Sequence, residues 1–153
     1  MKNNETIKYH WKNNKLPGIE GIVYPSGKII IMDFYEVIDN NITKFFINPV
    51  CETSIESVEN FNADIWCEIE KHPQFVEHDK NLFICGEGSM GNEGFFANVD
   101  IQNNLVWAFF STNSNPFYKL EIEEELLRVF TTSDLVFTLN INKPEEMKIH
   151  EKI

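Results

Sequence analysis

The sequence predicts an α+β fold, a mostly antiparallel β-sheet with one main helix of about residues 54–71 packed on it. Period-2 apolar runs lie on both sides of a single run with helical spacing. The chain has 153 residues, 42% of them hydrophobic and thirteen of them Phe, which is enough for an independent core. We therefore expect a single domain over residues 1–153.

The first predicted elements are three strands. Runs at residues 19–24 and 28–37 are rich in Ile, Phe and Tyr and flank a Pro-Ser-Gly turn at 25–27. Proline presets one turn dihedral and glycine supplies a positive φ, so the two runs should form a hairpin. An Asn-rich turn then leads into a third strand at 42–48, which Pro49 is expected to end. Together these runs predict a three-stranded meander.

The predicted helix begins near Thr53, which has capping-box spacing to Glu56. Apolar residues then recur at intervals of three and four: Ile55, Val58, Phe61, Ile65, Trp66 and Ile69. Polar residues near position 62 could divide this helix in two, and Pro73 should end it. Its other face carries Glu52, Glu56, Glu59, Glu68 and Glu70, so much negative charge should project from one helical surface.

The second half of the chain returns to the β period. Expected strands cover residues 82–85, 94–101, 105–111, 135–141 and 147–149. The run at 105–111 is apolar on both sides, as is typical of a central strand covered on both faces. Residues 117–130 fit either one helix or two strands, and we predict two strands. Asn103 and Asn104 supply a turn between two of these strands.

The charge distribution indicates what kind of partner the protein binds. The chain has 24 Asp and Glu against 13 Lys and Arg. Ten of the acids and two of the bases lie between Glu52 and Glu93, so this stretch carries 10 − 2 = 8 excess negative charges. Such a field repels nucleic acid and anionic membranes and speeds encounter with a basic protein. We therefore expect a binding protein with no nucleic-acid or membrane partner.

Cysteine usage and hydropathy bear on the compartment. The chain begins without a signal-like apolar run, and nowhere do eighteen apolar residues follow one another. Cys51, Cys67 and Cys85 are odd in number and scattered, which suits reduced thiols better than a disulfide framework. A cytoplasmic location is expected.

A glycine-rich segment, Gly86-Glu87-Gly88-Ser89-Met90-Gly91, matches the letters of a dinucleotide-binding loop. Its context does not match, because a Phe-rich strand follows where a helix N-terminus should face the phosphates. Glu87 would also place a negative charge beside them. We expect a wide turn between strands and no bound cofactor.

Two constellations could carry chemistry. Cys67, His72, His78 and Cys85 are all zinc-compatible, but they lack the close Cys pair of structural zinc sites, so no metal is expected. A small hydrolase using Cys85 with a histidine, or a pair of carboxylates, remains an alternative. Acidic neighbours such as Glu87 would disfavour the thiolate that this chemistry needs.

Exposed surfaces give two further expectations. Trp11 lies outside any strong periodic pattern and is flanked by Lys and Asn, so it is a candidate exposed anchor. An adaptor subunit that oligomerises through exposed strand edges is a further alternative.

Residues 86–117 contain GEGSMGNEGFFANVD, a turn, LVWAFF and then STNSNPF. This combination resembles small bacterial immunity proteins, which neutralise polymorphic or contact-dependent toxins. The resemblance covers about a fifth of the chain. It implies a cytoplasmic protein without catalytic activity that binds and blocks a cognate toxin, often a basic nuclease domain.

These observations predict a partner-binding surface and no catalytic, cofactor or metal site. The surface consists of acidic residues on the predicted helix and in the glycine-rich loop: Glu56, Glu59, Glu68, Glu70, Glu87 and Glu93. Carboxylates presented in this way would complement the phosphate-binding surface of a nuclease.

Overall fold

The computed structural model describes residues 2–151. The helices are α1 (Lys2–Lys12), α2 (Ile55–Phe61) and the short 3-10 helix η1 (Pro144–Glu146). The strands of the first half are β1 (Lys15–Pro17), β2 (Gly21–Val23), β3 (Lys28–Asp39), β4 (Ile42–Ser54), β5 (Trp66–Glu68) and β6 (Glu70–His78). Those of the second half are β7 (Asn81–Glu87), β8 (Gly94–Asp100), β9 (Leu105–Ser111), β10 (Phe117–Glu123), β11 (Leu126–Thr131), β12 (Leu135–Asn140) and β13 (Lys148–Glu151).

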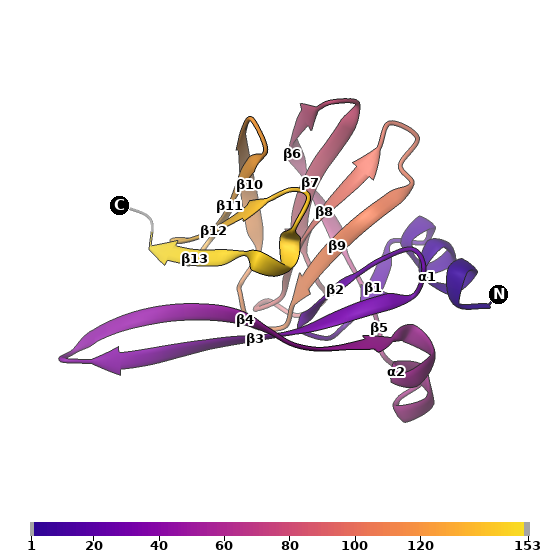
Figure 1. Ribbon diagram of the computed structural model, residues 1–153, viewed down its shortest axis with the longest axis horizontal. Coiled ribbons are helices and arrows are strands. Elements are labelled where there is room, and N and C mark those ends of the chain that lie inside the picture. Colours follow the sequence, from indigo (N-terminus) through magenta and orange to yellow (C-terminus); the bar gives the residue numbers. More distant parts are fainter. Residues whose placement is uncertain (1, 152–153) are drawn as a thin grey trace.

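The strands form three antiparallel sheets (Figure 1). The largest has seven strands in the order β4-β3-β2-β9-β8-β7-β6, and a four-stranded sheet has the order β10-β11-β12-β13. β1 and β5 pair separately. The mostly antiparallel sheet is confirmed, as is the meander of β2, β3 and β4.

Most of the aromatic core lies between the two larger sheets. Phe96 of the seven-stranded sheet meets Phe117 and Phe137 of the four-stranded sheet edge to face, with ring centroids 5.1 Å and 6.3 Å apart. All three rings are fully buried. Buried aromatic side chains in such offset contacts contribute strongly to a core, and here they join the two sheets.

A second core covers the opposite face of the large sheet, beneath α1 and α2. Central strand β9 serves both cores, because Trp107 and Phe109 face one and Ala108 and Phe110 face the other. The prediction of a strand covered on both faces is confirmed.

The expectation for Trp11 is wrong, because it belongs to this second core. Its side chain is 1% exposed, and its indole Nε1 donates to the Asn103 carbonyl at 3.1 Å. It lies on α1, an amphipathic helix that the sequence analysis did not predict. Ile7, one turn earlier, is buried in the same core. Trp11 therefore anchors α1 to the sheet rather than binding a partner.

The helix predicted for residues 54–71 is much shorter in the structure. α2 ends at Phe61, and its N-cap is Ser54, whose hydroxyl accepts from the Ser57 N–H at 3.2 Å, rather than Thr53. After it, Asp64 N–H donates to the Asn62 side chain at 3.0 Å, a local bond that competes with helical ones. Residues 66–68 and 70–78 then pair with β1 and β7. The prediction of one main helix is not confirmed.

Pro49 was expected to end a strand and Pro73 to end the helix, but each proline lies inside a strand. Pro49 lies inside β4, opposite Met32, beside a bulge in the ladder. Met32 donates its own N–H to the Glu20 carbonyl on the other side of β3, at 3.0 Å, so its backbone groups face away from Pro49 and the missing Pro49 N–H removes no bond between the two residues. Pro73 lies inside β6. Both β4 and β6 are edge strands, where a missing N–H removes no ladder bond on the open side.

The remaining strand predictions agree with the structure. Residues 117–130 form the β10–β11 hairpin, and Asn103 and Asn104 lie in the turn between β8 and β9. β3 and β4 continue well beyond the rest of their sheet as a two-stranded ribbon, which extends to the left of the body in Figure 1. This ribbon carries exposed apolar side chains, Ile38 and Ile42 among them.

Candidate functional site

The six predicted glutamates come from four elements and one loop rather than from one helical face. Glu56 and Glu59 lie on α2, Glu68 ends β5 and Glu70 begins β6. Glu87 ends β7, and Glu93 lies in the glycine-rich loop that leads into β8. The prediction that one helix presents Glu56, Glu59, Glu68 and Glu70 together is therefore wrong, although the chain pairing brings several of them close together.

Glu59 has a structural contact. Its carboxylate accepts a 2.8 Å hydrogen bond from the indole Nε1 of Trp66. The Trp66 ring in turn stacks on the His10 ring of α1, with centroids 3.5 Å apart and planes within 4°. Glu59 therefore links α2 to β5 and α1, whereas Glu56, on the same helix, is exposed.

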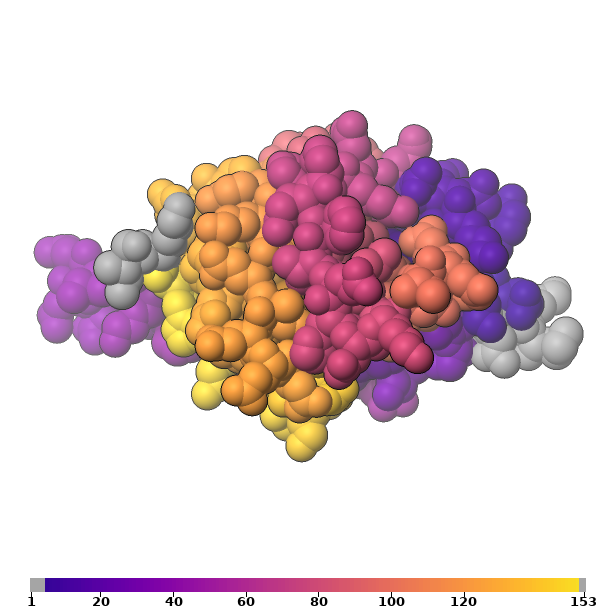
Figure 2. Space-filling model, turned by 90° about the horizontal axis from the view of Figure 1, so that it is seen from above, coloured from indigo at the N-terminus to yellow at the C-terminus, as the bar shows by residue number. Residues whose placement is uncertain are grey.

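Glu70 and Glu87 are paired across two neighbouring strands. They are directly opposite each other in the β6–β7 ladder, and both are exposed. Side chains in such a pair have Cβ atoms about 4.5–5.5 Å apart, and like charges there are destabilising. The pair lines a cavity of about 450 Å³ that also holds His72 and Tyr118. This cavity lies where the β6–β7 hairpin runs beside β10–β11, magenta and orange in Figure 2.

The glycine-rich loop folds onto β5, where Glu93 is held by several contacts. The Glu93 carboxylate accepts from the Met90 N–H at 3.0 Å and from the Cys67 thiol at 3.3 Å. Ser89 Oγ donates to the Glu68 carbonyl at 3.2 Å. Burial, with a further contribution from Glu93, raises the pKa of the Cys67 thiol. The glycine-rich loop is thus held in place by these hydrogen bonds.

The glycines of this segment permit close packing. A Cβ on Gly86 would collide with the Glu70 carbonyl, and one on Gly94 with the Asn115 carbonyl. Gly88 N–H donates to the Glu93 carbonyl, and Met90 N–H to the Glu93 side chain. A phosphate-binding loop would direct such N–H groups at its ligand, whereas these two point at glutamate.

Lys71 is the lysine that lines the cavity together with Glu70 and Glu87. Among the side chains that the structure describes, those of residues 5–151, the ion pairs are His78 with Asp79 and Lys119 with Glu121, and neither includes a predicted site glutamate. Lys71 follows Glu70, but its ammonium lies 5.2 Å from the centroid of the Trp11 ring. Burial lowers the pKa of Lys71. We call Glu68, Glu70, Glu87 and Glu93 the acidic surface.

Cys85 and the histidines do not meet. Cys85 is fully buried in the core between the two sheets, and burial raises its pKa to about 12. His72 lines the cavity formed by Glu70 and Glu87, and the lining of that cavity does not include Cys85. A nucleophilic thiol needs the opposite environment, an exposed site with a lowered pKa. In the described part of the chain, no group of three or more His, Cys, Asp or Glu could hold a metal ion.

Comparisons with protein-family models, with curated proteins and with solved structures found no match to this chain. None of the helices within residues 2–151 combines the length and the apolar character needed to cross a membrane.

Proposed function

We propose that this protein is an immunity protein that binds and blocks a basic toxin domain, such as a nuclease, through its acidic surface. One observation carries the proposal: Glu70 and Glu87 lie opposite each other in a ladder, and among the residues whose side chains are described neither these two nor Glu68 and Glu93 form an ion pair. A partner with clustered Lys and Arg would relieve this repulsion on binding.

The resemblance of residues 86–117 to immunity proteins gives the partner its class, and this segment contains two of the four acids, Glu87 and Glu93. The net charge of −11 adds long-range attraction for a basic partner. Under this proposal the protein works in the cytoplasm, where the toxin acts, and has no catalytic activity of its own. It inhibits by covering the phosphate-binding surface of the toxin.

Under this proposal a neighbouring gene encodes a basic toxin domain. The test is the rate of association with that domain, measured by stopped flow from low to high salt. Reversing Glu70 and Glu87 to Lys should slow association about tenfold at low salt, with the difference shrinking as salt rises. The matched control reverses Glu123 and Glu124, which are exposed at the β10–β11 turn. It makes the same change in net charge elsewhere.

Equal slowing in both double variants would mean that only overall charge matters, and no slowing in either would remove the acidic surface from the mechanism. Protection of toxin-expressing cells should follow the association rates. Glu59 is left unchanged in these variants because it accepts a hydrogen bond from Trp66, so its replacement would alter the stability of the protein as well as its binding.

A further inference from the structure

The strand β3 has one edge that is paired only in part. β4 pairs with it along its whole length, from Lys28 to Asp39. On the other edge β2 pairs with residues 29–31 only, and the last bond there runs from Met32 N–H to the Glu20 carbonyl. Among the described residues, no strand pairs with this edge from Asp33 to Asp39.

The alternating direction of backbone groups along a strand identifies which residues of β3 have unpaired N–H and C=O groups on this edge. Met32 directs its N–H toward the β2 side, and successive residues of a strand direct their groups to opposite sides. Phe34, Glu36 and Ile38 therefore present their N–H and C=O groups to the open edge. An extended polypeptide that paired there would continue the sheet beyond the end of β2, as in β-strand addition.

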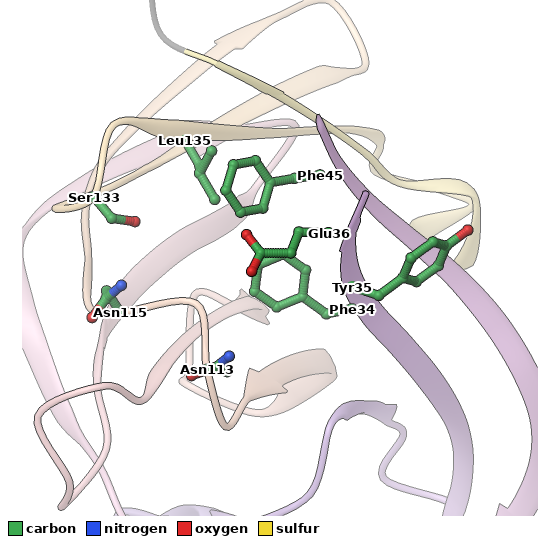
Figure 3. Close-up of a pocket in the computed structure, with 8 residues that line it drawn as sticks. All are labelled: Phe34, Tyr35, Glu36, Phe45, Asn113, Asn115, Ser133 and Leu135. Atoms are coloured by element: carbon green, nitrogen blue, oxygen red, sulfur yellow. The ribbon is translucent and has the colours of Figure 1, made fainter. Parts of the chain in front are cut away.

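A cavity lies along this edge, where the two large sheets separate (Figure 3). It has a volume of about 300 Å³, room for a few side chains rather than for a large ligand. Phe34, Phe45 and Leu135 give it an apolar wall. Its opposite wall comes from two turns and consists of Asn113, Asn115 and Ser133. Side chains at alternate positions of an added strand would enter it.

The charges around the cavity define what would bind. The Glu36 carboxylate projects into it, between the Phe34 ring and Ser133 (Figure 3), and no Lys or Arg lines it. Glu20 and Asp33 lie at the N-terminal end of β2, close enough for their charges to interact. Glu20 is held there by two 2.9 Å hydrogen bonds from Thr112, the neighbour of Asn113. A basic side chain between apolar ones complements this arrangement.

We propose that the open edge of β3 binds an extended segment of a partner protein, whose alternate side chains are apolar, basic and apolar and enter the cavity beside Glu36. This inference goes beyond the proposed function, because the cavity beside β3 and the cavity lined by Glu70 and Glu87 share no lining residue. The segment pairs with Phe34, Glu36 and Ile38, and its basic side chain contacts the Glu36 carboxylate. A second copy of the chain is a less suitable occupant, since a net charge of −11 on each copy opposes the pairing.

The probe is the synthetic peptide Thr-Val-Thr-Lys-Thr-Leu-Thr with both ends blocked, titrated into the full-length labelled chain by NMR. Its Val, Lys and Leu share one face of a strand. Binding should shift the amide signals of Phe34, Glu36 and Ile38 and slow their hydrogen exchange about tenfold. Two further peptides carry N-methyl groups at alternate residues, in the two possible alternations. Only one of the two alternations replaces the N–H groups that face β3. The peptide with that alternation should lose binding, and the other should keep it.

Two protein variants test the charge contact. Glu36→Gln should weaken binding about fivefold, as for the loss of one solvent-accessible ion pair. Asp39→Asn makes the same change at the end of the same strand, outside the cavity lining, and should alter affinity less than about twofold. Replacing Lys of the peptide by Glu should abolish binding.

Several results would overturn the proposal. These are the absence of binding at millimolar peptide, shifts confined to other strands, or equal binding of the two methylated peptides. Dimers in sedimentation with the Phe34 and Glu36 amides already protected would instead show a second copy on this edge. None of these results bears on toxin association through Glu70 and Glu87, so the two proposals fail separately.

Discussion

The carboxylate of Glu59 and the indole N–H of Trp66 are joined by a 2.8 Å hydrogen bond that ties α2 to β5. The bond spans the connection of residues 62–65 between the end of α2 and the start of β5. Trp66 also stacks on His10, so one residue connects three elements. Glu59 therefore has a structural role that Glu56, four-fifths of a turn earlier on the helix, does not share.

Replacing Glu59 by Ala should lower the free energy of unfolding by about 1–2 kcal/mol, since it leaves a partly buried indole donor without its charged acceptor. Glu56→Ala should stay within about 0.5 kcal/mol of the natural protein, as is usual for an exposed residue without such contacts. Urea unfolding measures both. Equal losses in the two variants would mean that the bond contributes nothing to stability.

Replacing Glu70 by Gln should increase stability by about 0.2–1 kcal/mol at low salt, because it removes one member of a like-charged cross-strand pair. The gain should shrink in 1 M salt, where exposed charges are screened. Thermal unfolding at the two salt concentrations checks this. A loss of stability at low salt would show that Glu70 makes favourable contacts that outweigh the repulsion.

The three thiols should differ in reactivity toward iodoacetamide at pH 8. Cys51 is exposed, Cys67 is half-buried with a raised pKa, and Cys85 is buried with a pKa raised to about 12. Because the thiolate is the reacting form, labelling should proceed in that order, and Cys85 should react only after unfolding. Mass spectrometry of timed samples gives the rates. Labelling of Cys85 as fast as Cys51 in the folded protein would revive the hydrolase alternative.

Glu20 should make stability depend on pH. Burial, with Asp33 adding to it, raises the pKa of Glu20 above its ordinary 4.5. The folded state then holds the proton more tightly than the unfolded state, so stability is full below pH 4.5 and falls as pH rises through the folded pKa.

Glu20→Gln should therefore be more stable than the natural protein at pH 7.5, with the difference disappearing at pH 4. The Gln side chain keeps an oxygen for the two Thr112 hydrogen bonds. Unfolding at the two pH values measures the effect. A constant difference at both would assign it to packing rather than to the proton.

Most strands could be predicted from the sequence because their pattern depends on near neighbours. The period-2 runs and the Pro-Ser-Gly turn identify β2 and β3 without knowledge of the rest of the fold. Gly27 does adopt the positive φ, 100°, that the turn prediction required. Pro49 was misread because its tolerance depends on β4 being an edge strand, which only the complete sheet order defines.

The helix and Trp11 could not be predicted correctly because distant pairing decided them. Ile65, Trp66 and Ile69 keep helical spacing to Ile55, but pairing of β5 with β1, near the N-terminus, draws the chain into strands. Tertiary contacts commonly override such local patterns. Trp11 is buried because α1 packs on Phe95, far along the chain, with ring centroids 6.4 Å apart.

The sequence could predict the excess of negative charge at the candidate site but not the relative positions of its glutamates. The sequence identifies Glu70 and Glu87 as acids in the same charged segment, but their direct opposition depends on the β6–β7 register. The cavity beside β3 gave no sequence signal, because residues 113–115 and 133–135 meet Phe34 and Glu36 only in the folded chain.

The two prolines on the edge strands of the seven-stranded sheet bear on how the molecule avoids fibre growth. Pro49 and Pro73 each lie beside a register irregularity, on opposite edges of that sheet. An incoming strand that tried to extend the sheet at β4 would meet a position with no donor and a locally bent backbone. At β6 it would also meet β10, whose Leu120 backbone bonds to the Gln74 side chain. Molecule-to-molecule stacking of the kind that builds amyloid is therefore interrupted at both ends of the large sheet. A concentrated solution should stay clear, and Pro49→Val should shorten the lag before thioflavin-positive aggregates form.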